Sequence, residues 1–236
     1  MIIYNNEIVA GRSSEFNLET ISDKVEFTTD LIEIKYPWDI FSNNFHAIEY
    51  DYDLLTNGRT SQPISDTNRV INPERIFIEE GAKVEFSILN ASEGPIYIGK
   101  DAEIMEGSMV RGGLALCEHA KINMGSKIYA GCTIGPYCKV GGELNNAILM
   151  AYSNKGHDGF LGNAVIGEWC NLGADTNNSN LKNNYSEVKV WNYPSERFIK
   201  TGLQFCGLIM GDYSKSAINT QFNTGTIVGV SANIFQ

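Results

Sequence analysis

An aliphatic residue recurs at every sixth position through the middle of the chain, and this period restricts the fold more than any other feature. The eight positions are Ile98, Ile104, Val110, Leu116, Ile122, Ile128, Ile134 and Val140. A period of six fits neither the 3.6 residues of an α-helical turn nor the two of a strand, but it is typical of a parallel β-helix. We therefore predict an all-β fold in which residues 98–236 form a hexapeptide-repeat parallel β-helix.

The repeat also predicts the cross-section of this β-helix. Each group of six residues forms one side of a prism and three groups close a coil, so equivalent positions stack about 4.8 Å apart. The aliphatic residues should then point inward. The residue four places after each of them is usually small and should fit near a corner, although Leu114 and Leu144 are larger.

After Val140 the period restarts and is then interrupted. The predicted inward positions are Ile148, Asn154, Phe160, Ile166 and Leu172, then Met210, Ser216, Phe222, Val228 and Ile234. On this register Asn154 is the only polar residue in the first of these two runs. The polar, aromatic excursion at residues 178–208 should be a loop over one face, either functional or a simple cover.

Residues 1–65 differ from the rest of the chain. Two short apolar runs, residues 2–4 and 8–10, flank the turn-prone pair Asn5 and Asn6, and a segment of helical character starts at Pro37. Residues 66–97 resemble a first, less regular coil with inward positions at Ile78 and Val84. We predict a small α+β piece at 1–65 and a β-helical domain at 66–236.

The composition excludes several classes of partner. The net charge is −10 with no long run of either sign, so we expect no nucleic-acid partner. No apolar stretch of about 18 residues and no signal sequence are present, which predicts a cytoplasmic protein without a membrane partner. The five cysteines are an odd number without CxxC spacing, and we interpret them as reduced core residues.

One of the three histidines lies in a sequence typical of a site. His157 is within the polar, glycine-rich run at residues 152–162. His46 has no visible partner in the sequence, and His119 lies within the regular repeat at a position typical of a surface residue. The alternative for His157 is a loop histidine that hydrogen-bonds to its own surroundings. We expect Tyr152, Asn154 and Lys155 of the same run to contact substrate.

The run from Gly156 to Asn180 (GHDGFLGNAVIGEWCNLGADTNNSN) resembles a known family. It is similar to the acetyltransferase half of the bacterial bifunctional glucosamine-1-phosphate acetyltransferase/N-acetylglucosamine-1-phosphate uridylyltransferases, and closest to a divergent branch of sugar nucleotidyltransferases that also carries the later Asn-Thr-Gly-Thr of residues 223–226. The resemblance covers most of residues 66–236. It implies a left-handed coil and a homotrimer with sites between neighbouring subunits. We expect no metal, because the three histidines are widely spread along the chain.

The resemblance also implies roles for individual residues. His157 matches the general base of the family, and an imidazole with a pKa near 6.5 suits removal of a proton from an attacking amine, worth about 10²- to 10⁴-fold in rate. Asn180 matches an asparagine that assists at the reacting centre. Lys155 and Lys182 could supply charge to a phosphate, or could simply be solvated.

The sequence departs from the better-known branch of this family at three positions. Phe160 and Leu181 stand where that branch has tyrosines, and Asp175 replaces a glycine. These changes leave the identity of the sugar open. No glycine-rich nucleotide-binding signature is present, and residues 1–65 resemble only the last strands and linker helix of a nucleotidyltransferase domain, so we expect the chain to be the carboxy-terminal portion of a longer protein.

Three hypotheses follow. The first is an N-acetyltransferase that uses acetyl-CoA and an amino-sugar 1-phosphate similar to glucosamine 1-phosphate. The second is a trimerising or regulatory β-helix of a sugar-1-phosphate nucleotidyltransferase. The third, a β-helical metal enzyme with three converging histidines, is disfavoured because no second histidine neighbours His119 or His157.

Overall fold

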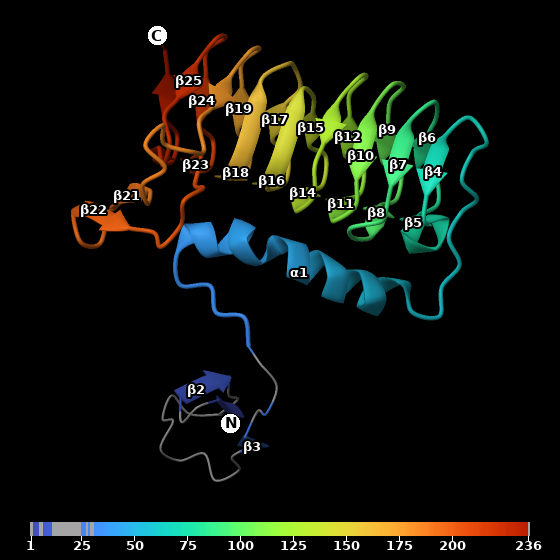
Figure 1. Cartoon of the computed structure of the whole chain (residues 1–236), viewed down its shortest axis with the longest axis horizontal. Helices are drawn as coiled ribbons and strands as arrows, with labels where there is room; N and C mark the ends of the chain where they lie inside the picture. The colour runs from blue at the N-terminus through green and yellow to red at the C-terminus, as the bar shows by residue number, and fades with distance from the viewer. Residues whose placement is uncertain (1, 5–6, 11–24, 27, 29–30, 236) are drawn as a thin grey trace. The chain divides into compact units, whose positions relative to one another are not determined.

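The computed structural model describes residues 2–4, 7–10, 25–26, 28 and 31–235. The chain divides into two compact units, Met1–Glu33 and Ile34–Gln236. The larger unit is a left-handed parallel β-solenoid of about 9 turns that carries one long helix (Figure 1). The predicted fold class is therefore confirmed.

The solenoid has three faces, A, B and C, and each coil passes through them in that order. Face A contains β4 (Arg69–Ile71), β7 (Ile88–Asn90), β10 (Met109–Arg111), β13 (Lys127–Ile128), the first halves of β16 (Glu143–Leu149) and β18 (Phe160–Ile166), then β20 (Asn177–Asn178) and β25 (Gln221–Phe222). Between β18 and β20 the Asn178 side-chain amide bonds both the N–H and the carbonyl of Gly162, at 2.8 and 2.9 Å, and so continues the face.

The other two faces are continuous parallel sheets. Face B contains β5 (Ile76–Ile78), β8 (Ile96–Ile98), β11 (Leu114–Leu116), β14 (Cys132–Ile134), the second halves of β16 and β18, β23 (Ile209–Met210) and β26 (Ile227–Val228). Face C contains β6 (Lys83–Val84), β9 (Glu103–Ile104), β12 (Lys121–Ile122), β15 (Lys139–Val140), β17 (Asn154–Lys155), β19 (Asn171–Leu172), β24 (Lys215–Ser216) and β27 (Asn233–Ile234). A short 3₁₀ helix, η2 (Pro73–Arg75), precedes β5.

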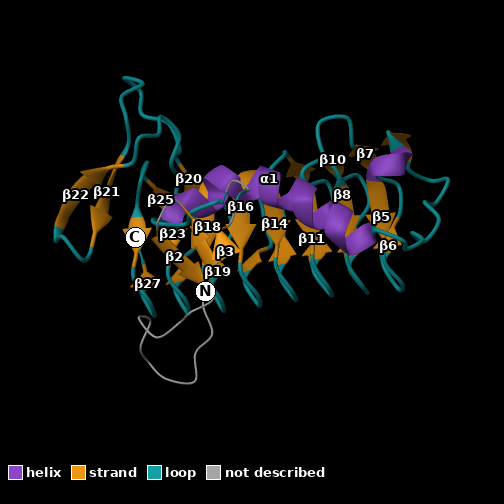
Figure 2. Ribbon diagram, turned by 90° about the horizontal axis from the view of Figure 1, so that it is seen from below, coloured by secondary structure: helices purple, strands orange, loops and turns teal. Residues whose placement is uncertain are grey.

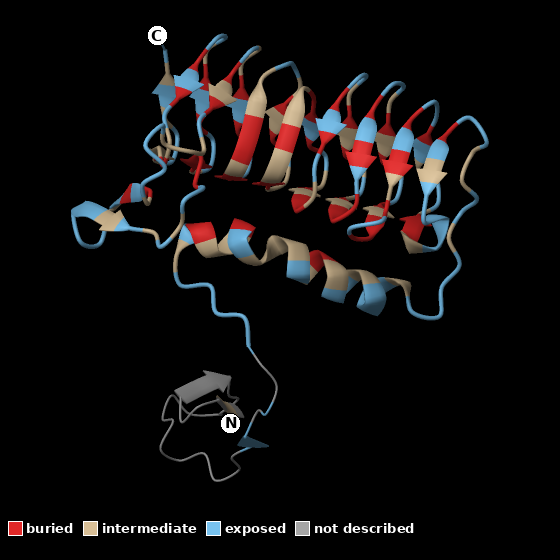
Figure 3. Cartoon of the chain, viewed as in Figure 1, coloured by how far each residue is buried: buried red, intermediate tan, exposed pale blue. Residues whose placement is uncertain are grey.

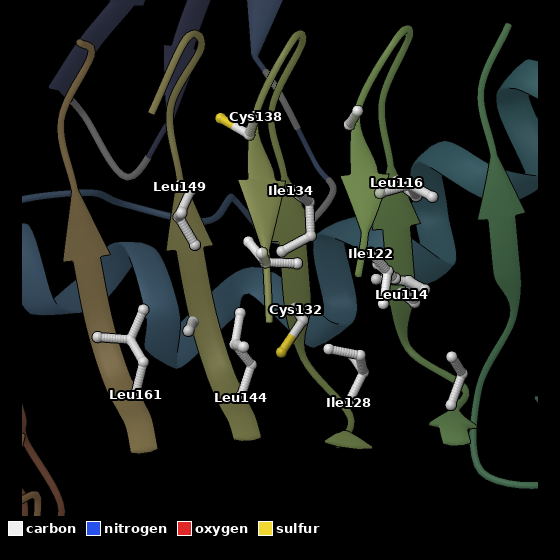
Figure 4. Packing of buried hydrophobic residues seen from close by; sticks show 14 of the residues in the cluster. Leu114, Leu116, Ile122, Ile128, Cys132, Ile134, Cys138, Leu144, Leu149 and Leu161 are labelled. Carbon is white, nitrogen blue, oxygen red and sulfur yellow. The ribbon is translucent and has the colours of Figure 1, made fainter. Parts of the chain in front are cut away.

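The interior is the predicted aliphatic column. All eight ladder residues from Ile98 to Val140 are buried in one cluster, with Ile78 and Val84 of the first coil (Figures 3 and 4). The small corner residues are also enclosed, as at Ala120 and Cys132. All five cysteines are free thiols, and burial raises the pKa of Cys132 to about 12. Four of them are buried in the hydrophobic clusters, as predicted, whereas Cys117 is only partly buried and belongs to neither cluster.

One coil is shorter than the others, and the predicted register is wrong there. A regular coil has eighteen residues, as between the aligned residues Ile122 and Val140. The next coil, between the aligned residues Val140 and Lys155, has only fifteen. The chain loses two residues at the corner between Val140 and Leu144, and one more because β16 runs straight from face A to face B. The missing residues shift the inward positions by one.

The inward residues of this coil and the next are therefore Leu149, Lys155 and Leu161, in place of Ile148, Asn154 and Phe160. Ile148 is buried, but it points outward beneath a helix. From Ile166 onward the predicted register is correct again, and Met210, Phe222 and Val228 belong to the core.

Helix α1 (Pro37–Thr56) lies along face B, across β11, β14, β16 and β18 (Figure 2). It begins where predicted, because Pro37 occupies the first turn and the Asp39 carboxylate accepts the Tyr36 N–H at 2.7 Å. Trp38 and Phe41 pack against outward residues of face B in a second hydrophobic cluster. The helix, grouped with residues 1–65 by sequence, is thus packed as part of the solenoid unit.

The excursion after β20 folds into an antiparallel hairpin, β21 (Lys189–Asn192) and β22 (Arg197–Lys200). The base of the hairpin, through Val188, Val190 and Cys206, joins the same second cluster as Trp38 and Phe41. The predicted loop over one face is therefore present, and its inner side covers part of face B.

The smaller unit contains the predicted pair of apolar runs. Strand β1 (Ile2–Tyr4) pairs antiparallel with β2 (Glu7–Ala10) and parallel with β3 (Val25–Glu26). The expected turn at Asn5 and Asn6 lies outside the described residues. Where the chain is described, no helix is both long enough and apolar enough to cross a membrane.

Candidate functional site

His157 lies at the corner that leads from face C to face A, in a four-residue loop, Gly156–Gly159. The side chain is exposed, and its imidazole makes no hydrogen bond to the part of the chain that the structure describes. Gly159 has a φ of 115°, and a Cβ there would overlap the carbonyl oxygen of Thr176 in the next coil. Only glycine fits this position, so the backbone places the loop closely between two neighbouring coils.

The shortened corner below this loop leaves a hollow in the edge of the prism. A Cβ on Gly142, whose φ is 77°, would lie 2.7 Å from the carbonyl oxygen of Gly159, and a Cβ on Gly141 would lie 2.5 Å from that of Gly156. The loop therefore rests directly on bare backbone. The resulting corner hollow, of about 330 Å³, is lined by Asn123, Met124, Gly141, Gly142, Gly156, His157, Asp158, Ala174 and Asp175.

A second hollow adjoins the first on the outer side of face C. This face hollow has a volume of about 480 Å³ and is lined by Asn123, Lys139, Asn154, Gly156, His157, Asn171, Leu172, Gly173, Ala174 and Ile218. His157 belongs to both hollows. A ligand that occupied both would contact His157.

The two hollows carry opposite charge. Asp158 and Asp175 line the corner hollow, whereas the face hollow contains Lys139. Lys139 forms no ion pair with any described residue, while the next lysine along the face, Lys121, is bonded to Glu103 at 2.6 Å. The site therefore offers carboxylates on one side of His157 and an unpaired ammonium on the other.

Lys155 lies inside the prism and not on its surface. Its side chain is 1% exposed, and its Nζ donates to the carbonyl oxygens of His157, Asp158 and Gly141 at 2.7, 3.1 and 3.2 Å. Burial lowers the pKa of its ammonium to about 8, against the opposing effect of Asp158 and Asp175. Because all three donors are already used within the protein, this position corrects the expectation that Lys155 contacts a substrate phosphate.

Other groups hold the remaining carbonyls of the loop. Asn123 Nδ2 reaches across the corner hollow to the Gly156 oxygen at 2.7 Å, and the Glu143 N–H bonds the Gly159 oxygen at 3.2 Å. With the bonds from Lys155, every carbonyl from residue 156 to residue 159 has a donor. The loop is thus fixed from the protein side while its histidine remains exposed.

Asn180 lies at the far end of face A from the loop, and it lines neither hollow. Its Nδ2 donates to Asn163 Oδ1 at 2.8 Å. The Phe160 ring and the Asn180 amide lie together over Gly162, where a side chain would meet both. Phe160, three residues after His157, therefore lies between the histidine and Asn180 on the outer surface.

Tyr152 belongs to a column of stacked rings at the corner between faces B and C. The ring centroids lie 4.6 to 6.4 Å apart, and each residue has a φ near 60°. The column contains His119, Tyr137, Tyr152, Trp169 and Tyr213. Tyr152 is absent from both hollows, so the structure does not bring it to His157.

Of the two remaining predicted substrate contacts, Asn154 lines a hollow and Lys182 does not. Asn154 lines the face hollow beside Lys139. Lys182 is half-buried and its Nζ donates to the carbonyl oxygen of Glu187 at 3.1 Å, within the excursion. Of the six predicted site residues, only His157 and Asn154 line the hollows, and Lys155 lies directly beneath the loop.

The histidines do not converge. His157 and His119 lie at different corners of the prism, and His46 lies on α1, next to Glu49 at 4.0 Å. In the described ranges no group of three histidine, cysteine, aspartate or glutamate side chains is close enough to hold a metal ion.

Asp158 and Asp175 line the corner hollow but were not predicted as site residues. Three further polar residues of the site were also missed by sequence reasoning: Asn123, Lys139 and Asn171. Each occupies an outward position of face C or the residue after it, where polar side chains occur in every coil. The available signal was the spacing of four, in place of six, between Val140 and Leu144. Such a deletion in a regular solenoid leaves a gap at one corner, and the residues around that gap are candidates for a site.

Comparison with known proteins concerns the beginning of the chain. A family model described as sugar nucleotidyl transferase matches residues 1–60, about a quarter of the sequence, and this segment includes α1. No curated protein matches the chain in sequence. Together, the match and the left-handed β-helix fit a transferase of sugar-nucleotide synthesis.

Proposed function

We propose that the solenoid is an N-acetyltransferase that transfers the acetyl group of acetyl-CoA to the amine of an amino-sugar 1-phosphate. The observation that carries this proposal is the position of His157, an exposed imidazole on a fixed loop where two oppositely charged hollows meet. The resemblance of residues 156–180 to the acetyltransferase family supports the same reaction.

In the proposed reaction the amine nitrogen attacks the carbonyl carbon of the thioester. A C–N bond forms, the C–S bond breaks, and the amine proton passes to a ring nitrogen of His157. The proton then returns to the departing sulfur, which leaves as CoA. Backbone N–H groups of the loop stabilise the carbonyl oxygen while it carries negative charge.

The charges of the site suggest how the acceptor is oriented. A protonated amine is attracted to Asp158 and Asp175, and a phosphate is attracted to Lys139. In glucosamine 1-phosphate the amine on C2 neighbours the phosphate on C1, so an acceptor bound where the two hollows meet would direct its amine to the corner hollow and its phosphate to the face hollow, with the amine near His157. Asn154 and Asn171 line the phosphate side and can donate hydrogen bonds to its oxygens.

We expect Lys139→Met to raise the KM for the sugar phosphate about tenfold, because a hydrogen bond to a charged group is lost. Steady-state kinetics with glucosamine 1-phosphate varied at saturating acetyl-CoA measures this. Lys121→Met is the matched control, since Lys121 lies on the same face, is already paired with Glu103 and lines neither hollow. Equal effects of the two substitutions would point to general charge and not to a phosphate contact.

Asn180→Ala should have a smaller effect than removal of the histidine. Its amide lies beside Phe160 and not in the hollows, so we expect kcat to fall by about 10- to 100-fold, below the range for a lost oxyanion contact. Single-turnover acetyl transfer measures the chemical step. A wild-type rate would remove Asn180 from the proposed site.

Ligand binding tests the proposal before any turnover is measured. Acetyl-CoA and the correct sugar 1-phosphate should each raise the unfolding temperature, because a ligand that binds only the native state stabilises it. A panel containing glucosamine 1-phosphate, N-acetylglucosamine 1-phosphate and glucose 1-phosphate also identifies the sugar. If acetyl-CoA has no effect at any concentration, the acetyltransferase proposal fails.

A second function is favoured by a separate observation. The segment matched by the nucleotidyl transferase model includes α1, and this helix is packed along face B. The solenoid could therefore serve as a trimerising or regulatory module for a sugar-1-phosphate nucleotidyltransferase. Absence of acetyl-CoA binding, together with intact assembly, would favour this function.

We also propose that the protein is a homotrimer. Face A of the first coils exposes several apolar side chains around a hollow of about 310 Å³, among them Ile88, Met109 and Tyr129, and an exposed apolar patch is typical of an interface. A cyclic arrangement would close without leaving this surface free. Light scattering should give three times the chain mass of 26.1 kDa. A monomer at micromolar concentration would contradict the proposal.

A further inference from the structure

Lys155 occupies a place where an aliphatic side chain is expected. On face C, Lys155 aligns with Val140 in the preceding coil and with Leu172 in the following coil. All three side chains point inward. Lys155 is the only charged side chain among the buried residues of the described chain. Enclosing an ammonium costs free energy unless its donors are satisfied, so an isolated lysine here requires an explanation.

The hydrogen bonds of Lys155 are concentrated on one loop. An ammonium has three donors, and here they go to three carbonyl oxygens, two of them in consecutive residues of the loop, His157 and Asp158. The third, Gly141, lies at the shortened corner on which the loop rests. The side chain thus joins the loop to the coil below from inside the prism.

These bonds also determine where the loop amides point. In a trans peptide the carbonyl and the N–H of the next residue point in opposite directions, and the described chain has no cis peptide. Because the oxygens of His157 and Asp158 face the buried ammonium, the N–H groups of Asp158 and Gly159 face away from the interior. Neither N–H donates to another group in the described chain.

We propose that Lys155 is a positioning residue, which holds His157 in place and turns the N–H groups of Asp158 and Gly159 outward beside it. Two adjacent outward N–H groups form a site for an oxygen that carries negative charge. In the acetyl transfer proposed above, on which this role depends, that oxygen is the thioester carbonyl oxygen in the transition state. Lys155 itself touches no substrate.

The test compares Lys155→Met with Ile122→Met. Methionine fills the same space without donors, and Ile122 is an inward residue of the same column two coils below, outside both hollows. Two bonded amides report on the loop: Glu143 N–H donates to the Gly159 carbonyl oxygen at 3.2 Å, and Phe160 N–H donates to Asn177 Oδ1 at 2.7 Å. Hydrogen exchange followed by mass spectrometry should show at least about tenfold faster exchange of these two amides in Lys155→Met, since the bonds that hold the loop are lost. Exchange at the neighbouring corner, residues 124–126, should stay unchanged.

The kinetic readout separates positioning from general destabilisation. In Lys155→Met we expect kcat for acetyl transfer to fall by about tenfold or more with the KM for acetyl-CoA nearly unchanged, because the loop amides act mainly in the transition state. Ile122→Met should keep both values. A rise in KM alone, or equal losses in the two variants, would overturn the positioning role.

A measurement on the unmodified protein covers the case in which Lys155→Met does not fold. Burial lowers the pKa of Lys155 to about 8, and a neutral amine has only two donors for three carbonyls. Between about pH 7 and about pH 9.5, exchange of the Glu143 and Phe160 amides should rise relative to residues 124–126, after correction for base catalysis. A constant ratio would overturn the proposal.

The exchange experiments do not depend on catalysis. If exchange of the Glu143 and Phe160 amides rises as expected and the unmodified protein transfers no acetyl group, Lys155 still positions the loop and only the proposed reaction fails. If exchange does not respond to Lys155, the positioning role fails whatever the activity.

Discussion

Replacing His157 with alanine should lower acetyl transfer from acetyl-CoA to glucosamine 1-phosphate by about 10²- to 10⁴-fold, the range for loss of a positioned general base. The fold should not change, because the side chain is exposed at a corner, makes no bond to the described residues and contributes nothing to the core. Product formation is measured by mass spectrometry, and the circular dichroism spectrum and unfolding temperature are compared with those of the unmodified protein.

His119→Ala is the matched control for this experiment. His119 also lies at a corner and its side chain is partly exposed, but it belongs to the ring column at the corner between faces B and C. We expect its replacement to leave kcat unchanged. Full activity of His157→Ala, or equal losses in both variants, would exclude a base at position 157.

The pH dependence gives a second distinction. A general base must be neutral to accept the amine proton, so an acidic limb in the rate profile is the signature of such a base. In His157→Ala the residual rate should lose this acidic limb, whereas His119→Ala should keep it. The shape of the profile thus assigns the base independently of the size of the rate loss.

The regular part of the solenoid was predictable because each inward residue repeats the same physical requirement. Aliphatic side chains at every sixth position fill one layer of the interior, and the layers above and below it need aliphatic side chains at the equivalent positions. The inward residues from Ile98 to Val140 could therefore be identified from the sequence alone. The excursion and α1 were also recognisable, the first by its loss of period and the second by the helical character of the segment that starts at Pro37.

The shortened coil was not predictable from the same rule. Once residues are missing at a corner, the six-residue period no longer shows which of two neighbouring residues points inward. Asn154 was predicted to point inward, but Lys155 does so instead. A polarity argument favours asparagine over lysine for the interior, because a buried charge costs more than a buried amide. The actual outcome depends on three carbonyls that no sequence pattern displays.

The candidate site was predictable in its centre and not in its surroundings. The glycine-rich run around His157 indicated a site because glycines allow close approach of coils and the histidine has no role in the aliphatic ladder. Asn123 and Lys139 come from earlier coils and meet His157 only because coils stack. Tyr152, next to the run in sequence, instead joins the ring column at another corner.

The stability of the protein should report the burial of Lys155 directly. The pKa of this ammonium is lowered from 10.5 to about 8 by burial in the folded chain, whereas the unfolded chain keeps the ordinary value. Between these two pH values the unfolded chain binds more protons than the folded chain, so the free energy of unfolding rises with pH. The full difference corresponds to about 3 kcal/mol.

We therefore expect the free energy of unfolding of the unmodified protein to rise by up to about 3 kcal/mol, relative to Lys155→Met, between about pH 7.5 and about pH 10.5. Urea unfolding of both proteins across this range measures it. Subtracting the free energy of unfolding of Lys155→Met at each pH removes the contribution of the other titrating groups. Comparing this difference between pH values removes the constant contribution of packing, which differs between lysine and methionine. A gap that does not change with pH would mean that the ammonium is solvated in the folded protein.

Taken with the role proposed for Lys155, this pH dependence has an unusual consequence. Above about pH 8 the loss of charge should make the whole fold more resistant to urea. The loop at residues 156–159 should meanwhile lose one of its hydrogen bonds, so that the Glu143 and Phe160 amides exchange faster. A residue that served only to stabilise the prism would change both in the same direction. Opposite changes in global stability and loop protection would mean that the buried charge lowers the stability of the solenoid while it holds the loop that carries His157.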